Sequence, residues 1–203
     1  MHIETIGVIG ANAVGREVSL AALLGGYRVI LEDVSSETLQ TGIAYVEQSL
    51  HERVSQHALP RQERDLALAR FSTGSRAEEV CRVADMLIET VPEEMEVKLE
   101  IFTIFDKFAK PGAILASNTS LSITEIASIT FRTEDCIGMR FANGTPRITR
   151  VELVRGADTS DATIAVCSEA ARRMGMEAAI ICESAQPSAT DEFAAFRAKA
   201  GIE

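Results

Sequence analysis

Short apolar runs alternate with longer amphipathic stretches along this chain, most clearly near its start. The run 6–9 has the length and apolar density of a buried strand, and the stretch that begins at Ala13 has helical periodicity. A second apolar run, 27–33, ends in an acid, Asp33. The order strand, turn, helix, strand predicts a βαβ unit at this end of the chain.

The alternation continues through the rest of the chain. Further apolar runs predict strands at 71–73, 86–89, 113–117, 136–139, 151–154 and 177–182. Helical spacing predicts helices at 77–83, 93–108, 123–128, 161–174 and 191–200. Strands that alternate with helices favour an α/β fold, here a Rossmann-type, doubly wound and mostly parallel sheet.

One helical excursion interrupts this alternation between the second and third strands. Its two predicted helices cover 36–57 and 60–69, and the first can be capped by Ser35 or Ser36. The turn-like stretch 184–190 is the one domain edge that the sequence suggests. We therefore expect one domain over 1–183 and a C-terminal tail with a short helix over 184–203.

The composition excludes several classes of function. Of 203 residues, 46% are hydrophobic and 25% charged, and the net charge of −10 argues against nucleic acid or an anionic membrane as the main partner. We expect no signal peptide and no membrane span, because no apolar run reaches the ~18 residues that a span needs. The cysteines are scattered without a CxxC pair, which indicates reduced thiols of a cytoplasmic protein and no metal site. They are Cys81, Cys136, Cys167 and Cys182.

The glycine turn after the first strand is the most informative motif. Gly10 and Gly15 allow a tight turn that brings a helix N-terminus against a pyrophosphate, and Asp33 can accept hydrogen bonds from ribose hydroxyls. Asn12 stands where the motif has a glycine, and asparagine enters left-handed backbone conformations more readily than other side chains do. With Ala13 and Val14 in the same turn, the motif predicts an NAD site. A tight turn that binds no nucleotide is the alternative.

With these elements in order, the chain resembles the NAD-binding domain of the 3-hydroxyacyl-CoA dehydrogenase family. The resemblance covers Ile3 to about Cys182 and includes the helical excursion. Its specific parts are the segments 8–15, 89–94 with Lys98, 116–120 and 151–156. It implies an NAD-dependent oxidoreductase of fatty acid metabolism that acts on 3-oxo or 3-hydroxyacyl substrates carried by CoA or another carrier.

The resemblance implies a role for several residues near the cofactor. Asp33 matches the acid that binds the adenosine ribose, and Glu93 and Lys98 match residues near the nicotinamide half. Taken alone, such a Glu–Lys pair is more often solvated surface. Asn118 follows a strand, at the edge where ligands collect in open α/β sheets.

Among the residues expected near the substrate, this sequence differs from the family pattern at the catalytic position. Ser120 matches the serine that hydrogen-bonds the substrate's 3-oxygen, Asn143 an asparagine near nicotinamide and substrate, and Glu152 the acid that orients a catalytic histidine. That histidine is replaced by Arg140, which stays protonated and cannot take a proton from an alcohol. Arg140 can instead stabilise a developing alkoxide, or simply form an ion pair with Glu152. The histidines His2, His51 and His57 lie outside the segments expected to line the site.

Three further departures bear on function. Leu121 replaces a second serine, and the expected Pro-Gly-Phe after the last strand is missing. We also expect no helical second domain of the kind that the family has. We therefore expect a homodimer that covers apolar surface near Phe141, with Phe193 and Phe196 as contributors. The main hypothesis is an oxidoreductase with an altered proton-transfer group. The alternatives are a catalytically silent NAD-binding module and a fragment of a longer protein, although the C-terminal helix favours a natural end.

Overall fold

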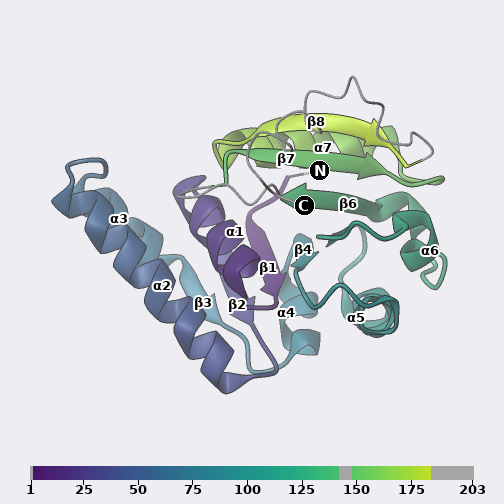
Figure 1. Ribbon diagram of the computed structural model, residues 1–203, viewed down its shortest axis with the longest axis horizontal. Helices are drawn as coiled ribbons and strands as arrows, with labels where there is room; N and C mark the ends of the chain where they lie inside the picture. The colour runs from purple at the N-terminus through teal and green to yellow at the C-terminus, as the bar shows by residue number, and fades with distance from the viewer. Residues whose placement is uncertain (1, 142–147, 184–203) are drawn as a thin grey trace.

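A computed structural model describes residues 2–141 and 148–183 of the chain. Its centre is an eight-stranded sheet in the order β3-β2-β1-β4-β5-β6-β7-β8 (Figure 1). Among the strands of the described residues, only β6 and β7 pair in antiparallel fashion. The strands are β1 Thr5–Ile9, β2 Arg28–Glu32, β3 Phe71–Thr73, β4 Met86–Glu89, β5 Ile114–Ser117, β6 Cys136–Phe141, β7 Arg150–Arg155 and β8 Glu177–Cys182.

Helices cover both faces of the sheet, as the doubly wound fold predicts. One buried cluster joins β1 and β2 to α1, α2 and α7, and a second joins β4 and β5 to α4, α5 and α6. In Figure 1, α2 and α3 lie together outside α1 and form the predicted helical excursion. The α-helices are α1 Ala13–Leu24, α2 Ser36–Ser55, α3 Arg61–Ala69, α4 Ala77–Val83, α5 Met95–Phe108, α6 Ile123–Ala127 and α7 Asp161–Arg173. A 3-10 turn, Thr133–Asp135, precedes β6.

The element pattern predicted from hydrophobic periodicity is confirmed for the part of the chain that the structure describes. The largest differences, of two residues each, are at ends: α2 ends at Ser55 and not at 57, α5 begins at Met95 and not at 93, and β6 runs on to Phe141. The predicted helix 191–200, the tail 184–203 and Asn143 lie outside the described residues.

The antiparallel pair β6 and β7 follows from the length of the chain between them. A parallel pair needs a crossover of a dozen or more residues, usually a helix, and β7 begins at Arg150 soon after β6 ends at Phe141. The register places Arg140 opposite Glu152. This pairing brings two predicted site residues together.

Two further expectations can be compared with the described residues. None of their helices has the length and apolar character needed to cross a bilayer. All four cysteines are free thiols, three of them buried, while Cys182 at the end of β8 is exposed. No group of histidine, cysteine and acidic side chains within the described ranges could hold a metal ion.

Candidate cofactor and catalytic site

The turn between β1 and α1 requires both of its glycines. Gly10 has a φ of +105°, which side chains rarely tolerate, and a Cβ on Gly15 would lie 1.9 Å from the Gly10 carbonyl oxygen. Asparagine was expected to suit position 12 because it enters left-handed backbone conformations, and this reason was wrong. Asn12 is the N-cap of α1 with a φ of −65°, and its side chain accepts hydrogen bonds from Val14 N–H and Gly15 N–H at 3.0 and 3.1 Å. Asparagine suits this position as a helix cap.

The carboxylate of Asp33 is fixed at the end of β2 by two backbone donors. Its Oδ2 accepts from Ala11 N–H at 2.7 Å, and its Oδ1 from Ser35 N–H at 2.8 Å. Each carboxylate oxygen has a second lone pair. Asp33 can therefore accept further hydrogen bonds from ligand hydroxyls while it is held in place by the glycine turn.

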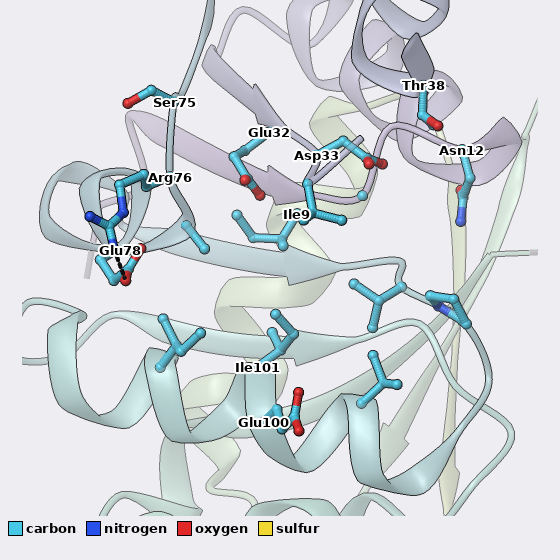
Figure 2. Close-up of a pocket in the computed structure, with 17 residues that line it drawn as sticks. Ile9, Asn12, Glu32, Asp33, Thr38, Ser75, Arg76, Glu78, Glu100 and Ile101 are labelled. Atoms are coloured by element: carbon cyan, nitrogen blue, oxygen red, sulfur yellow. Dashed lines mark hydrogen bonds and ion pairs between the residues drawn. The ribbon is translucent and has the colours of Figure 1, made fainter. Parts of the chain in front are cut away.

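A cavity of about 770 Å³ lies beside Asp33 and the glycine turn, between the end of β2, the loop after β4 and the helices α4 and α5 (Figure 2). Its volume falls within the ~300–1,000 Å³ of small-molecule and cofactor sites. Most of its wall is apolar, and Figure 2 shows Asn12 and Asp33 at one end. The apolar lining residues are Ile9, Val34, Ala77, Val91, Pro92, Val97, Ile101 and Ile104. These residues fit the adenosine half of a dinucleotide, because the apolar wall suits a base and the acid suits a ribose.

Lys98 is completely buried, so the alternative of a solvated surface pair does not hold for this lysine. Its Nζ lies 2.9 Å from Glu89 Oε1 and 3.3 Å from Glu93 Oε2, and it donates to the Asn118 backbone oxygen at 3.1 Å. Glu89 is also fully buried. The sequence reasoning assigned no role to Glu89, although an acid that ends a buried apolar strand is a signal for a paired charge.

Glu93 holds the loop that follows β5. Its carboxylate accepts from the Thr119 hydroxyl at 2.9 Å, from Leu121 N–H at 3.2 Å and from Ser120 N–H. Burial by itself raises the pKa of Glu93, but the hydrogen bonds from Ser120 N–H and Thr119 and the Lys98 ammonium outweigh it, so the pKa lies below its usual value. Glu93 therefore stays ionised and fixes the backbone that carries the exposed Ser120.

Arg140 lies against the same loop from β6. Its Nε donates to the Thr119 backbone oxygen at 2.7 Å, and its Nη1 lies 3.7 Å from Glu152 Oε2. The Glu152 side chain is 1% exposed and that of Arg140 is 25% exposed. Asn118 joins the group, because its Oδ1 accepts from Phe141 N–H at 3.2 Å. The fold thus brings Asn118 and the Ser120 loop after β5 together with Arg140 of β6 and Glu152 of β7.

Among the described residues, this arrangement offers a fixed cation but no group suited to take a proton near neutral pH. Arginine remains protonated in proteins. The three histidines of the chain, His2, His51 and His57, are all exposed and lie elsewhere. The site can therefore stabilise negative charge more readily than it can act as a general base.

Comparison with known proteins is consistent with this architecture. Residues 5–184 match the sequence pattern of the family described as "3-hydroxyacyl-CoA dehydrogenase, NAD binding domain". The chain is 37% identical over 179 residues to a 3-hydroxybutyryl-CoA dehydrogenase of Bradyrhizobium diazoefficiens, covering 88% of this chain and 61% of that protein. A probable 3-hydroxybutyryl-CoA dehydrogenase of Bacillus subtilis is 35% identical, with 88% and 62% covered.

A solved structure supports the same relationship. The crystal structure of (S)-3-hydroxybutyryl-CoA dehydrogenase from Ralstonia eutropha matches with a TM-score of 0.85 and 32% identity, covering 90% of this chain and 65% of that one. The chain spans about three fifths of the length of the curated relatives it matches, at 61% and 62%. It belongs to the family of the 3-hydroxyacyl-CoA dehydrogenase NAD-binding domain, and NAD is its cofactor.

Proposed function

We propose that this protein transfers hydride between NAD and a 3-oxo or 3-hydroxyacyl substrate carried by CoA or another carrier, and that it favours reduction of the 3-oxo form. One observation carries the proposal. The Arg140 guanidinium is held against the loop of Ser120 by the Thr119 carbonyl and the buried Glu152. A fixed cation at this point stabilises the negative charge that develops on a reduced carbonyl oxygen.

The cofactor residues divide between the two halves of the dinucleotide. The turn Gly10–Gly15 and the first turn of α1, with Ala13 and Val14, would hold the pyrophosphate. Asp33 would bind the adenosine ribose, and Glu93 and Lys98 would lie near the nicotinamide half together with Asn118. NAD supplies the hydride acceptor or donor when it is bound.

The substrate residues act on the oxygen at position 3. The Ser120 hydroxyl would donate a hydrogen bond to this oxygen, and Asn143 would contact the same part of the substrate. Arg140 would stabilise the charge, while water supplies the proton. Glu152 would keep the guanidinium oriented and act as a positioning residue.

A titration followed by a turnover assay tests this proposal. NADH and NAD are titrated first, and absorbance of the nicotinamide band is then followed with acetoacetyl thioesters. Binding with turnover supports the oxidoreductase. Binding without turnover across several 3-oxo and 3-hydroxy substrates contradicts it and supports the second candidate.

The second candidate is a catalytically silent NAD-binding module, a regulatory or assembly subunit. One contact favours it: Arg140 Nε is already committed to the Thr119 carbonyl at 2.7 Å. Arg140 and Glu152 would then act as a structural ion pair between β6 and β7. Ser120 and Asn143 would have no substrate to bind.

We further propose that the protein forms a homodimer in the cytoplasm. Ile180 on β8 is 56% exposed, and within the described strands β8 pairs with β7 alone. An apolar side chain on an edge strand favours association with a second copy. The four free thiols suit a reducing compartment. Light scattering at increasing protein concentration tests the dimer. A mass of one chain at every concentration, for the wild-type protein as well as for Ile180→Lys, would exclude it.

The division into a domain over 1–183 and a tail over 184–203 is also a proposal. It is supported by β8, which is the last strand in the described part of the chain and ends at Cys182. Limited proteolysis followed by mass spectrometry tests it. Cleavage confined to the region after 183 supports the boundary, and early cleavage inside the sheet contradicts it.

A further inference from the structure

Glu32, the last residue of β2, is a buried residue whose carboxylate faces the cavity and accepts no hydrogen bond from the described residues. The residue is 7% exposed, and Figure 2 shows its carboxylate turned into the cavity beside Asp33. Its backbone is fixed, because Gly10 N–H donates to the Glu32 carbonyl at 2.8 Å. Within the described ranges, the hydrogen bonds of the structure include none to this carboxylate, whereas the neighbouring Asp33 carboxylate accepts two.

The charged groups around Glu32 do not neutralise the negative charge of its carboxylate. Burial raises the pKa of Glu32, and the carboxylates of Asp33 and Glu78 raise it further. The nearby cation, Arg76, is engaged elsewhere, since its Nη2 lies 3.1 Å from Glu78 Oε1. The Glu32 carboxylate therefore faces the cavity beside other acids, where it can accept a hydrogen bond from a bound ligand.

The surroundings of Glu32 limit which ligand group can satisfy it. The α5 side of the cavity is formed by the apolar side chains of Val97, Ile101 and Ile104 and by the carboxylate of Glu100. The apolar side chains accept the flat face of a base, and ionised Glu100 can only accept hydrogen bonds, so this side offers no donor to Glu32. Glu32 is an acceptor when ionised, so it is suited to a base with an exocyclic amino group. A base with an oxo group at that position would point lone pairs at the carboxylate.

We propose that Glu32 accepts a hydrogen bond from the 6-amino group of adenine and makes this site selective for adenine dinucleotides. The inference rests on the dinucleotide placement in the proposed function and not on hydride transfer. It assigns Glu32 a part distinct from that of Asp33, which would bind the ribose.

The test compares NADH with reduced nicotinamide hypoxanthine dinucleotide, in which an oxo group replaces the amino group. Dissociation constants are measured by calorimetry. Loss of a hydrogen bond to a charged group raises a dissociation constant about 10–100-fold. The wild-type protein should therefore bind the hypoxanthine analogue more weakly than NADH by that factor. Equal affinity of the two, or no binding of either, would overturn the proposal without any variant.

Two variants locate the effect. Glu32→Leu should bring the two dissociation constants to within about twofold, and Glu32→Gln, which keeps an acceptor, should retain part of the selectivity. Asp33→Asn is the matched control, because it should weaken both dinucleotides together and leave their ratio unchanged. If Glu32→Leu keeps the wild-type ratio, Glu32 does not recognise the base. A protein that shows this ratio but never turns over substrate would contradict the proposed function and leave the inference intact.

The free protein provides a second measurement. Removal of a carboxylate that lies beside the carboxylates of Asp33 and Glu78 should raise the melting temperature in Glu32→Leu, although the same variant should bind NADH less tightly. Glu47→Leu, an exposed acid on α2, should leave both properties close to wild type. A Glu32→Leu protein with a lower melting temperature and unchanged NADH affinity would give Glu32 a structural role instead.

Discussion

Lys98 Nζ on α5 lies 2.9 Å from Glu89 Oε1 at the end of β4, with both side chains completely buried. The same ammonium donates to the Asn118 backbone oxygen after β5 and pairs with Glu93. The Ser117 hydroxyl and Val91 N–H donate to the Glu89 carboxylate. This buried pair therefore ties together the ends of β4 and β5, from which the loops of the cofactor and substrate residues extend.

Replacing Lys98 should destabilise the fold strongly. Lys98→Met preserves the chain length of the side chain but leaves Glu89 buried without its cation, and removal of one partner of a buried pair costs about 3–5 kcal/mol. The measurement is the free energy of unfolding in urea. Lys107→Met, an exposed position on the same helix, should change it by less than about 0.5 kcal/mol. A Lys98→Met protein as stable as wild type would show that the pair contributes nothing.

The pH dependence of stability should include a contribution from Asp85. Burial by itself raises the pKa of Asp85, but Lys110, Thr5 N–H and Glu4 N–H outweigh it and leave the pKa below its usual value. The two N–H donors lie at 2.8 and 2.9 Å and the Lys110 ammonium at 2.6 Å. Since the folded pKa is depressed, this stabilisation is present above the unfolded pKa of about 3.9 and is lost as the pH falls through the folded value.

Asp85→Asn tests this directly. The variant should be less stable than wild type at pH 7, and the difference should shrink as the pH is lowered below about 4. Urea unfolding at a series of pH values measures it. Asp161→Asn, whose side chain is 94% exposed in its ion pair with Arg155, serves as the control. A difference between Asp85→Asn and wild type that stays constant with pH would contradict the assignment.

Asp33 should determine affinity and selectivity for the dinucleotide. Asp33→Ala should weaken NAD binding by about 1–3 kcal/mol, the range of hydrogen bonds to a charged group. NADP should bind wild type more weakly than NAD, because the Asp33 and Glu32 carboxylates repel a 2′-phosphate. Calorimetric titration of both dinucleotides measures this, with Asp65→Ala on α3 as control. Equal affinities of wild type for NAD and NADP would show the ribose assignment to be wrong.

Much of the fold was accessible from the sequence, because buried strands and amphipathic helices leave periodic patterns. Asp33 was placed correctly, since a βαβ order fixes where the second strand ends. The burial of Lys98 was not predicted, because hydropathy treats lysine as exposed and its partner Glu89 belongs to a different element. The unpaired state of Glu32 depends on which side chains surround the cavity, which no local pattern records. The helix cap formed by Asn12 was also not predicted, because it depends on the backbone angles at that one residue.

The Arg140–Glu152 pair gives the sharpest test of the chemistry. Because Arg140 stays protonated, reduction of a 3-oxo substrate should be measurable while the reverse oxidation is slow near neutral pH. Arg140→His should raise the oxidation rate, since Glu152 lies directly opposite in the register and can orient an imidazole. General-base catalysis typically contributes about 10²–10⁴-fold, and imperfect substrate positioning would lower this gain.

Three variants distinguish the roles of Arg140 in the same spectrophotometric assay. Arg140→Ala should slow reduction if the guanidinium stabilises the alkoxide. Arg150→His adds an imidazole to β7 away from the pair and should leave oxidation slow. If Arg140→His leaves oxidation undetectable and Arg140→Ala leaves reduction unchanged, Arg140 has no catalytic role. The ion pair with Glu152 would then be structural, and the silent NAD-binding module would account better for this site.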